Sequence, residues 1–197
     1  MDMEPIRVML VEDDPFWRDH ISADLAEESD IEVAALATTK EEAIEAATRQ
    51  TLDVVLMDIN LTGNNLDGLE AAEHILRIPA QETVKVIMLT SISEADVIMK
   101  SFRLGALNYI NKSSCKDILQ AIRDAHRGRA SIHCDAARVM RNEVQLMELT
   151  PMEREVFDLR RNGLSKREIS EKLQKSANTI KSQLRSIKNK LTNFKID

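Results

Sequence analysis

Asp53-Val-Val-Leu-Met-Asp58-Ile-Asn60 is the stretch that decides the fold. Its centre, Val54 to Met57, is a short apolar run with two β-branched residues and polar residues on both sides. Such a run is typical of a buried strand. The strand ends on a carboxylate, Asp58, and open parallel sheets gather their functional groups outside the carboxyl ends of their strands. One aspartate in this position more often caps the next segment, so Asp58 alone does not define a site.

Three further predicted strands end on polar residues in the same way. Ile6–Val11 is followed by Glu12, Asp13 and Asp14, Val84–Leu89 by Thr90 and Ser91, and Leu107–Ile110 by Asn111 and Lys112. Because the carboxyl ends of parallel strands share one edge of the sheet, we expect these acids, the hydroxyl and the lysine to converge on Asp58.

Helical patterns separate the predicted strands. Apolar spacing, N-cap residues and helix breakers predict helices over about 15–29, 40–50, 68–77, 94–104 and 114–127, with one more strand over 31–37. Five strands that alternate with five helices indicate an α/β fold, in which a five-stranded parallel sheet forms a doubly wound layer.

The rest of the chain is predicted to be all α. Residues 136–147 fit one amphipathic linker helix. Thr150 and Ser165 each stand three residues before a glutamate, the capping-box pattern, and Ser176 is a third N-cap residue. These caps predict helices over about 151–161, 166–174 and 177–191. Two helices joined by a tight turn, the second of them basic, are similar to a helix-turn-helix.

The charge of the chain is divided along its length. The net charge is −6, but residues 1–126 hold 11 Lys and Arg against 24 Asp and Glu, whereas residues 150–197 hold 12 against 6. An acidic first part and a basic last part suggest two tasks, the second of them on nucleic acid.

Several classes of protein are disfavoured by composition. No apolar run approaches the roughly 20 residues that span a bilayer, and the first residues lack the pattern of a signal peptide. Cys115 and Cys134 are too few and too far apart to predict a disulfide framework or a zinc site. We therefore expect a cytoplasmic protein that does not bind membranes.

The acidic residues at the strand ends predict a metal site. Glu12, Asp13 and Asp58 would repel one another by about 4 kcal/mol for each pair at 4 Å, so the pocket favours a divalent cation. Oxygen ligands without His or Cys favour Mg²⁺. Beside such an ion a carboxylate can attack phosphorus, while Lys112 neutralises the phosphoryl oxygens and Thr90 donates its hydroxyl. The chain has no Gly-rich phosphate loop of the kind that binds ATP.

These motifs, taken in order, resemble a known family. Residues 5–127 resemble the receiver domain of response regulators, and residues 149–191 resemble the LuxR-type helix-turn-helix of the NarL/FixJ class. The receiver motifs are Val11-Glu12-Asp13-Asp14, Leu56-Met57-Asp58-Ile59-Asn60, Asp67-Gly68, Leu89-Thr90-Ser91 and Tyr109-Ile-Asn-Lys112. The helix-turn-helix motifs are Leu149-Thr-Pro-Met-Glu-Arg-Glu155, Gly163-Leu-Ser-Lys-Arg-Glu-Ile169 and Thr179-Ile-Lys181, with Ile187 and Lys190-Leu191.

The resemblance implies a role for each matching residue. Asp58 would be the phosphoacceptor and Asp13 a direct Mg²⁺ ligand, while Glu12 would act through water and Asn60 through its backbone carbonyl. The residues that would contact phosphate or form the switch are Thr90, Tyr109 and Lys112. The residues that would contact DNA are Lys181, Ser182 and Arg185 in the major groove and Lys188 on phosphate.

The resemblance also implies an architecture and a function. The limits would be 1–127 for a flavodoxin-like receiver domain, 128–148 for a partly helical linker and 149–197 for a DNA-binding domain. The chain would be the response regulator of a bacterial two-component system. It would accept a phosphoryl group from a histidine kinase, dimerise and bind double-stranded DNA to regulate transcription. It would not be a dedicated enzyme, although slow autodephosphorylation is compatible with the pocket.

Two other functions stay open at this point. A regulator that binds DNA without phosphorylation would keep a vestigial pocket. An aspartyl-phosphate phosphatase would use a similar nucleophile, but it would need a second aspartate at position 60, where Asn60 stands.

Overall fold

The computed structural model describes residues 4–63, 66–91, 94–129 and 132–191. The chain divides into two compact units, and the division falls between Val139 and Met140. This point lies inside the segment predicted as a linker. None of the helices in the described ranges is both long and apolar enough to cross a membrane.

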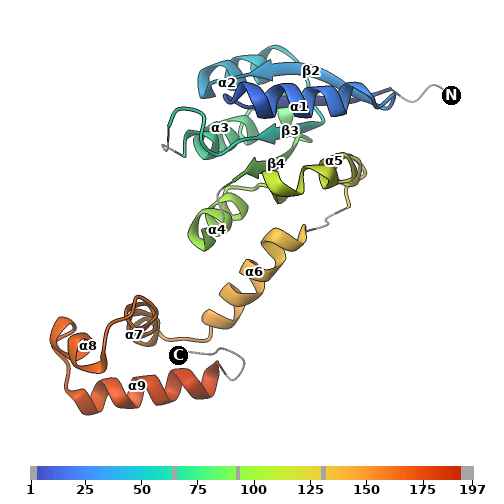
Figure 1. Cartoon of the computed structure of the whole chain (residues 1–197). Helices are drawn as coiled ribbons and strands as arrows, with labels where there is room; N and C mark the ends of the chain where they lie inside the picture. The colour runs from blue at the N-terminus through green and yellow to red at the C-terminus, as the bar shows by residue number, and fades with distance from the viewer. Residues whose placement is uncertain (1–3, 64–65, 92–93, 130–131, 192–197) are drawn as a thin grey trace. The chain divides into compact units, whose positions relative to one another are not determined.

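The first unit is built on a five-stranded parallel sheet (Figure 1). Its strands are β1 (Ile6–Val11), β2 (Ile31–Ala37), β3 (Val54–Met57), β4 (Lys85–Thr90) and β5 (Asn108–Asn111). They lie in the order β2-β1-β3-β4-β5, and each neighbouring pair is parallel. The predicted doubly wound α/β fold is thereby confirmed. The sheet reverses its winding at β1 and β3, where ligand sites form in such folds.

Five α-helices connect or follow the strands of this sheet. They are α1 (Pro15–Ala26), α2 (Lys40–Arg49), α3 (Asp67–Leu76), α4 (Ala95–Arg103) and α5 (Ile118–His126). Two short 3₁₀ segments, η1 (Pro79–Gln81) and η2 (Lys112–Asp117), lie before β4 and after β5.

The predicted start of the last helix of this unit, at residue 114, is wrong. The side chain of Asn111 accepts hydrogen bonds from the backbone N–H and the hydroxyl of Ser113, at 3.0 and 2.8 Å. These bonds favour a tight 3₁₀ turn directly after β5. Ser114 has a non-helical backbone with φ −104° and ψ 29°, so α5 begins only at Ile118.

The strands alternate between two cores because successive side chains of a strand point to opposite faces. Val8 and Leu10 face a core that α1 and α5 cover through residues such as Ile21 and Ile122. Met9 and Val11 face the opposite core, which α2, α3 and α4 cover. Val54 to Met57 are fully buried, as expected of a strand with helices on both sides.

The second unit is helical. Its elements are the end of α6 (Cys134–Leu146), α7 (Pro151–Arg161), α8 (Lys166–Lys172) and α9 (Ala177–Lys190). The capping predictions are confirmed, since Thr150 and Ser165 form complete capping boxes and Ser176 accepts the N–H of Thr179. These helices enclose a small core around Val156, Phe157, Ile169, Ile180 and Ile187.

The linker helix α6 begins two residues before the predicted start. Its first part belongs to the first unit, where Ala136 is buried and Val139 packs against the core beside α4. Its last residue, Leu146, belongs to the core of the second unit.

Candidate functional site

A pocket opens at the carboxyl edge of the sheet. Residues that follow β1, β3, β4 and β5 meet there, as the strand ends predicted. Its lining residues are Asp13, Asp14, Pro15, Trp17, Asp58, Asn60, Thr90, Ser91 and Lys112. Glu12 is fully buried beside the pocket. Carboxylate oxygens of Glu12, Asp13 and Asp58 lie within 4.8 Å of one another.

Lys112 bridges two of these carboxylates. Its Nζ donates hydrogen bonds of 2.8 Å to Oδ2 of Asp58 and to Oε1 of Glu12. It also lies 2.6 Å from Oε2 of Glu12, an ion-pair contact. Burial alone would lower the pKa of Lys112, but the hydrogen bonds to Asp58 and Glu12 outweigh it and raise this pKa. The lysine therefore stays charged in a buried site.

The acidic groups are held in unequal environments. Burial, opposed by the hydrogen bond from Lys112, raises the pKa of Glu12 to about 7. Burial, and then the nearby charge of Asp58, also raise the pKa of Asp13, although Asp13 is exposed. Each acid would be easier to ionise with another cation beside it. A ligand set made only of carboxylate oxygens fits Mg²⁺.

The backbone fixes the side chain of Asp58. The N–H of Asp58 donates to the carbonyl of Val11 at 2.9 Å, which extends the pairing of β1 with β3. Its Oδ1 accepts the N–H of Ile59 at 2.7 Å, while Oδ2 accepts from Lys112. One oxygen is thus held by backbone and the other by a cation, so the carboxylate is oriented before any ligand arrives.

Asp67 supports the loop that follows Asp58, a role that the sequence did not reveal. Its Oδ1 accepts the N–H of Leu61 at 2.9 Å, and its Oδ2 accepts the hydroxyl of Thr62. Burial would raise the pKa of Asp67, but these hydrogen bonds lower it. In the same loop Oδ1 of Asn60 accepts the N–H of Leu66 at 3.3 Å. In the sequence, Asp67-Gly68 stood out only as one of the motifs shared with the receiver family. That motif did not indicate what Asp67 contacts.

Gly68 lies against the backbone of Asp58. Its N–H donates to the carbonyl of Ile59 at 2.9 Å, and a Cβ at this position would stand 1.8 Å from the carbonyl oxygen of Asp58. Only glycine permits this approach.

We expect Gly68→Ala to lower the free energy of unfolding of the first unit by about 3 kcal/mol, since β3 and α3 must move apart. Urea unfolding followed by the fluorescence of Trp17, the single tryptophan of the chain, measures the loss. Gly63→Ala is the matched control, because no described atom lies within 4 Å of a Cβ added there and only its positive φ is strained. Equal losses for both variants would contradict the packing argument.

The two residues predicted as a switch pair line different pockets. Thr90 is the last residue of β4 and lines the acidic pocket. Tyr109 on β5 is only 1% exposed and lines a second pocket with Ile98, Asn111 and Arg138. Burial, and then the charge of Glu94, raise the pKa of Tyr109.

Two further residues at the pocket have contacts that the sequence did not predict. Asp14 is the N-cap of α1, since its Oδ1 accepts the N–H groups of Phe16 and Trp17 at 2.8 and 3.3 Å. The ring of Trp17 lies 5.8 Å from Nζ of Lys112, a cation–π distance. The sequence offered one indication of this contact, because its single tryptophan lies four residues after the acidic pair Glu12-Asp13.

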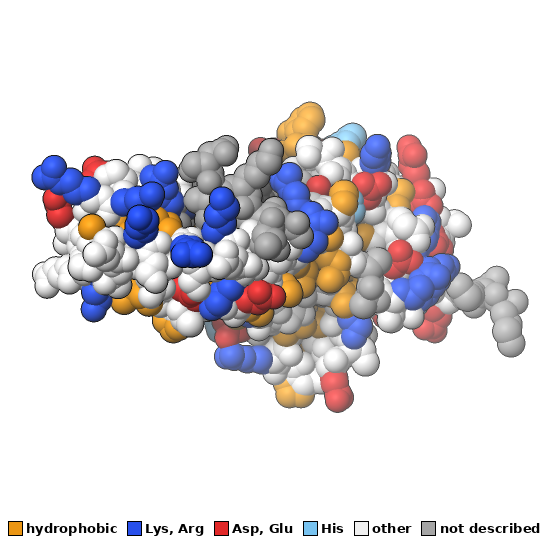
Figure 2. Space-filling model, turned by 90° about the horizontal axis from the view of Figure 1, so that it is seen from below, with side chains coloured by type: hydrophobic (Ala, Val, Ile, Leu, Met, Phe, Trp, Pro, Cys, Tyr) orange, Lys and Arg blue, Asp and Glu red, His pale blue; other side chains and the backbone are white. Residues whose placement is uncertain are grey.

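The second unit carries an exposed basic face. Lys181, Ser182, Arg185 and Lys188 are all exposed on α9. Among the described residues, Lys181, Arg185 and Lys188 make no ion pair. Figure 2 shows Lys and Arg side chains spread over the face that α9 forms. A helix presenting free cations is suited to the phosphates of nucleic acid.

Glu153 of α7 holds α9 in place through contacts with residues outside the exposed basic face. Its carboxylate accepts hydrogen bonds from Ser186 at 2.5 Å, from Nζ of Lys190 at 2.7 Å and from the N–H of Thr150 at 2.8 Å. The bonds from Lys190, Ser186 and Thr150 lower the pKa of Glu153 to about 2. Glu153 is 4% exposed. It therefore sets the orientation of the basic helix as well as capping α7.

We expect Glu153→Gln to lower the stability of α9 by about 2 kcal/mol at neutral pH, because charge-assisted hydrogen bonds are lost. The pKa lies at about 2 in the folded chain, below the ordinary 4.5. The contribution of the carboxylate is therefore complete above about pH 4.5 and disappears as the pH falls towards 2. Hydrogen exchange of the α9 amides, corrected for intrinsic rates, measures this stability. The protection of the parent and of the variant should become equal as the pH approaches the folded-state pKa of about 2.

Glu168→Gln is the control for this variant. Glu168 completes the other capping box by accepting the N–H of Ser165 at 2.7 Å, but it is exposed. If both variants destabilised α9 equally, the contact between α7 and α9 through Glu153 would be unimportant.

Comparison with known families gives one match in each of the two units. Residues 8–123 match the family described as Response regulator receiver domain, and residues 143–191 match the one described as Sigma-70, region 4. The chain belongs to the response regulators, and it joins a receiver domain to a helix-turn-helix DNA-binding domain of the NarL/FixJ class.

The chain is similar along most of its length to two staphylococcal regulators. The response regulator protein VraR of Staphylococcus aureus is 34% identical over 192 residues, which cover 94% of this chain and 90% of that protein. VraR of Staphylococcus saprophyticus is 32% identical over 194 residues, covering 95% of this chain and 90% of that protein. The solved complex of RcsB with DNA shares the fold, with a TM-score of 0.71 and 22% identity over 95% of this chain and 92% of that chain.

Proposed function

We propose that this response regulator accepts a phosphoryl group on Asp58 from a histidine kinase, and that the phosphorylated form dimerises and binds DNA through α9. The observation that carries the proposal is the position of Lys112 Nζ, 2.8 Å from Asp58 Oδ2 at the edge of an open pocket. The lysine prepares the pocket for a group with several negative oxygens.

The chemistry assigns a task to each side chain. An oxygen of Asp58 attacks phosphorus, and the bond from phosphorus to the leaving group breaks as the new bond forms. Asp13, Asp58 and the backbone carbonyl of Asn60, with Glu12 acting through water, would hold Mg²⁺, whose charge would neutralise the phosphoryl oxygens. Lys112 then exchanges part of its contact with Glu12 for a phosphoryl oxygen, and the hydroxyl of Thr90 donates to another.

The phosphoryl group would bias the receiver towards its active form. It adds a charge of about −1.5 to −2, and Lys112 and Thr90 respond to that charge. Tyr109 on the neighbouring strand would move with Thr90. Dimerisation would place two α9 helices on half-sites about one helical turn apart. A solved structure of RcsB dimers bound to DNA, which shares the fold, supports the proposal that a dimer binds DNA.

The proposal extends to the surroundings of the protein and to its domain limits. The protein works in the cytoplasm. The aspartyl phosphate is lost slowly by hydrolysis in the same pocket, without a dedicated enzymatic role. The receiver domain comprises residues 1–127 and the DNA-binding domain residues 149–197, with residues 128–148 as a linker between them.

Intact mass after incubation with acetyl phosphate and Mg²⁺ tests the phosphoacceptor. We expect one phosphoryl adduct on the parent and none on Asp58→Asn. Asp13→Asn should reduce the yield, and Asp14→Asn should not, because Asp14 caps α1. An adduct that persists in Asp58→Asn would overturn the assignment. No adduct on any variant, even with a histidine kinase as donor, would favour the DNA-binding regulator with a vestigial pocket.

A further inference from the structure

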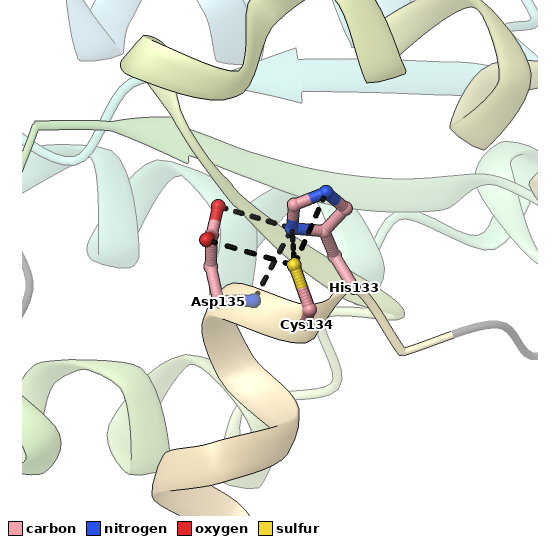
Figure 3. Close-up of side chains that lie close together, drawn as sticks. All are labelled: His133, Cys134 and Asp135. Atoms are coloured by element: carbon pink, nitrogen blue, oxygen red, sulfur yellow. Dashed lines mark hydrogen bonds and ion pairs between the residues drawn. The ribbon is translucent and has the colours of Figure 1, made fainter.

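A second group of metal-ligating side chains lies at the start of α6. His133, Cys134 and Asp135 are consecutive, and each offers one ligand atom within 4.8 Å of the other two. Figure 3 shows their side chains gathered at the first turn of α6 and turned towards one another. The residues belong to the first unit and take no part in the acidic pocket.

The distances among these atoms approach those of a tetrahedral metal shell. Nδ1 of His133 lies 3.0 Å from Oδ2 of Asp135, and Sγ of Cys134 lies 3.8 Å from Nδ1 and 4.0 Å from Oδ1 of Asp135. Ligand atoms around Zn²⁺ stand about 3.3–3.7 Å apart, as follows from bond lengths of about 2.0–2.3 Å. Different oxygens of Asp135 lie nearest to Nδ1 and to Sγ, so the carboxylate must turn and the sulfur must approach to complete the shell.

Asp117 holds the imidazole in the orientation that a ligand needs. Nε2 of His133 lies 3.0 Å from Oδ2 of Asp117, while Nδ1 accepts the N–H of Asp135 at 3.3 Å. In this arrangement Nε2 donates to Asp117 and Nδ1 is the acceptor, and a metal ion would take the Nδ1 lone pair in place of the N–H of Asp135. A histidine that donates its outer N–H to a carboxylate is the usual arrangement behind a metal ligand.

The charges around Nδ1 call for a cation. Nδ1 lies 3.0 Å from the carboxylate oxygen Oδ2 of Asp135, so a cation beside both atoms would be bound by each of them. The same carboxylate is held in place, since Oδ2 also accepts the N–H of Asn111 at 3.0 Å. Cys134 is exposed and can be reached from solvent.

We propose that His133 Nδ1, Cys134 Sγ and the carboxylate of Asp135 form a Zn²⁺ site, with Asp117 as the positioning residue behind His133. A thiolate, an imidazole and a carboxylate are a ligand set that suits Zn²⁺ rather than Mg²⁺. On binding, the thiol of Cys134 releases its proton to water, and the two negative ligands neutralise the ion. Three protein ligands leave one position for water or another donor.

The ion would hold together the side chains of the first turn of α6, which is already joined to β5. His133 already donates its backbone N–H to Oδ1 of Asn108 at 2.9 Å, and Asp135 binds the N–H of Asn111, so the two ends of β5 contact this turn. Metal binding would make this turn more rigid without involving Asp58. The inference therefore stands whether or not Asp58 is phosphorylated.

Cobalt titration of the reduced, chelator-treated full chain tests the site, with excess Mg²⁺ present to occupy the acidic pocket. We expect one Co²⁺ per chain, with a thiolate-to-cobalt charge-transfer band and the intense visible bands of tetrahedral Co²⁺, and we expect Zn²⁺ to displace it. Cys134→Ser should lose the charge-transfer band. Cys115→Ser, which alters the other cysteine, should keep it. Asp117→Asn should keep the band and weaken binding by about 10-fold or more.

Two results would overturn the proposal. One is the absence of a charge-transfer band in the parent chain at saturating Co²⁺. The other is a band that is as strong in Cys134→Ser as in the parent. Either result would mean that Cys134 does not bind a metal ion together with His133 and Asp135.

Discussion

Replacing Lys112 with methionine should lower the free energy of unfolding of the receiver by about 3–5 kcal/mol. Methionine keeps most of the length of the side chain but removes the ammonium group. Glu12 and Asp58, 0% and 6% exposed, would then face each other without a cation. The loss should grow as the pH rises through about 7, because protonated Glu12, whose pKa is already raised, relieves the repulsion below that point. Urea unfolding followed by Trp17 fluorescence reports on this unit alone.

Two companion variants make the prediction specific. In Lys112→Met/Asp58→Asn one of the repelling carboxylates is gone, so the double variant should be more stable than Lys112→Met. Lys40→Met removes a cation whose partner Glu70, at 3.0 Å, is 61% exposed, and it should cost at most about 1 kcal/mol. Similar losses at Lys40 and Lys112, or no recovery in the double variant, would show that the buried charges are not coupled.

The sequence was sufficient to predict the acidic pocket because its parts depend on strand ends. The end of an apolar run marks the end of a parallel strand, and the carboxyl ends of parallel strands lie together at one edge of the sheet. Asp13, Asp58 and Lys112 were found in this way. The N-caps of α7, α8 and α9 were predicted for a similar reason, since a capping box needs only residues three positions apart.

Contacts between distant residues account for what the sequence did not predict. The bond of Lys112 to Glu12 joins residues 100 positions apart, and that of His133 to Asp117 spans 16. Neither pair follows from a local pattern. The start of α6 was placed too late because its first turn is fixed by Asn108 and Asn111 of β5. Two scattered cysteines gave no reason to expect a zinc site, since a cluster of three consecutive ligands has no diagnostic spacing.

The basic face of α9 should account for most of the sequence-specific binding to DNA. Lys181→Ala/Arg185→Ala should weaken binding to a selected site by about 100-fold or more, since each lost base contact costs about 1–3 kcal/mol. Alanine favours helix, and both side chains are exposed, so α9 should stay folded. Lys188→Ala should instead weaken binding to all sequences alike and reduce the slope of log K against log salt by about 1.

Arg49→Ala/Arg77→Ala is the charge-matched control for this experiment. Both arginines are exposed on the receiver, where they pair with Glu45 and Glu73 at 2.5 Å, so the variant removes the same charge from the other unit. Fluorescence anisotropy at several salt concentrations, with DNA fragments selected by the phosphorylated chain, separates the effects. A control that lost as much affinity as Lys181→Ala/Arg185→Ala would mean that net charge alone governs binding. Unchanged specificity in the α9 variant would remove Lys181 and Arg185 from the major groove, and the contacts would then have to be sought on another element.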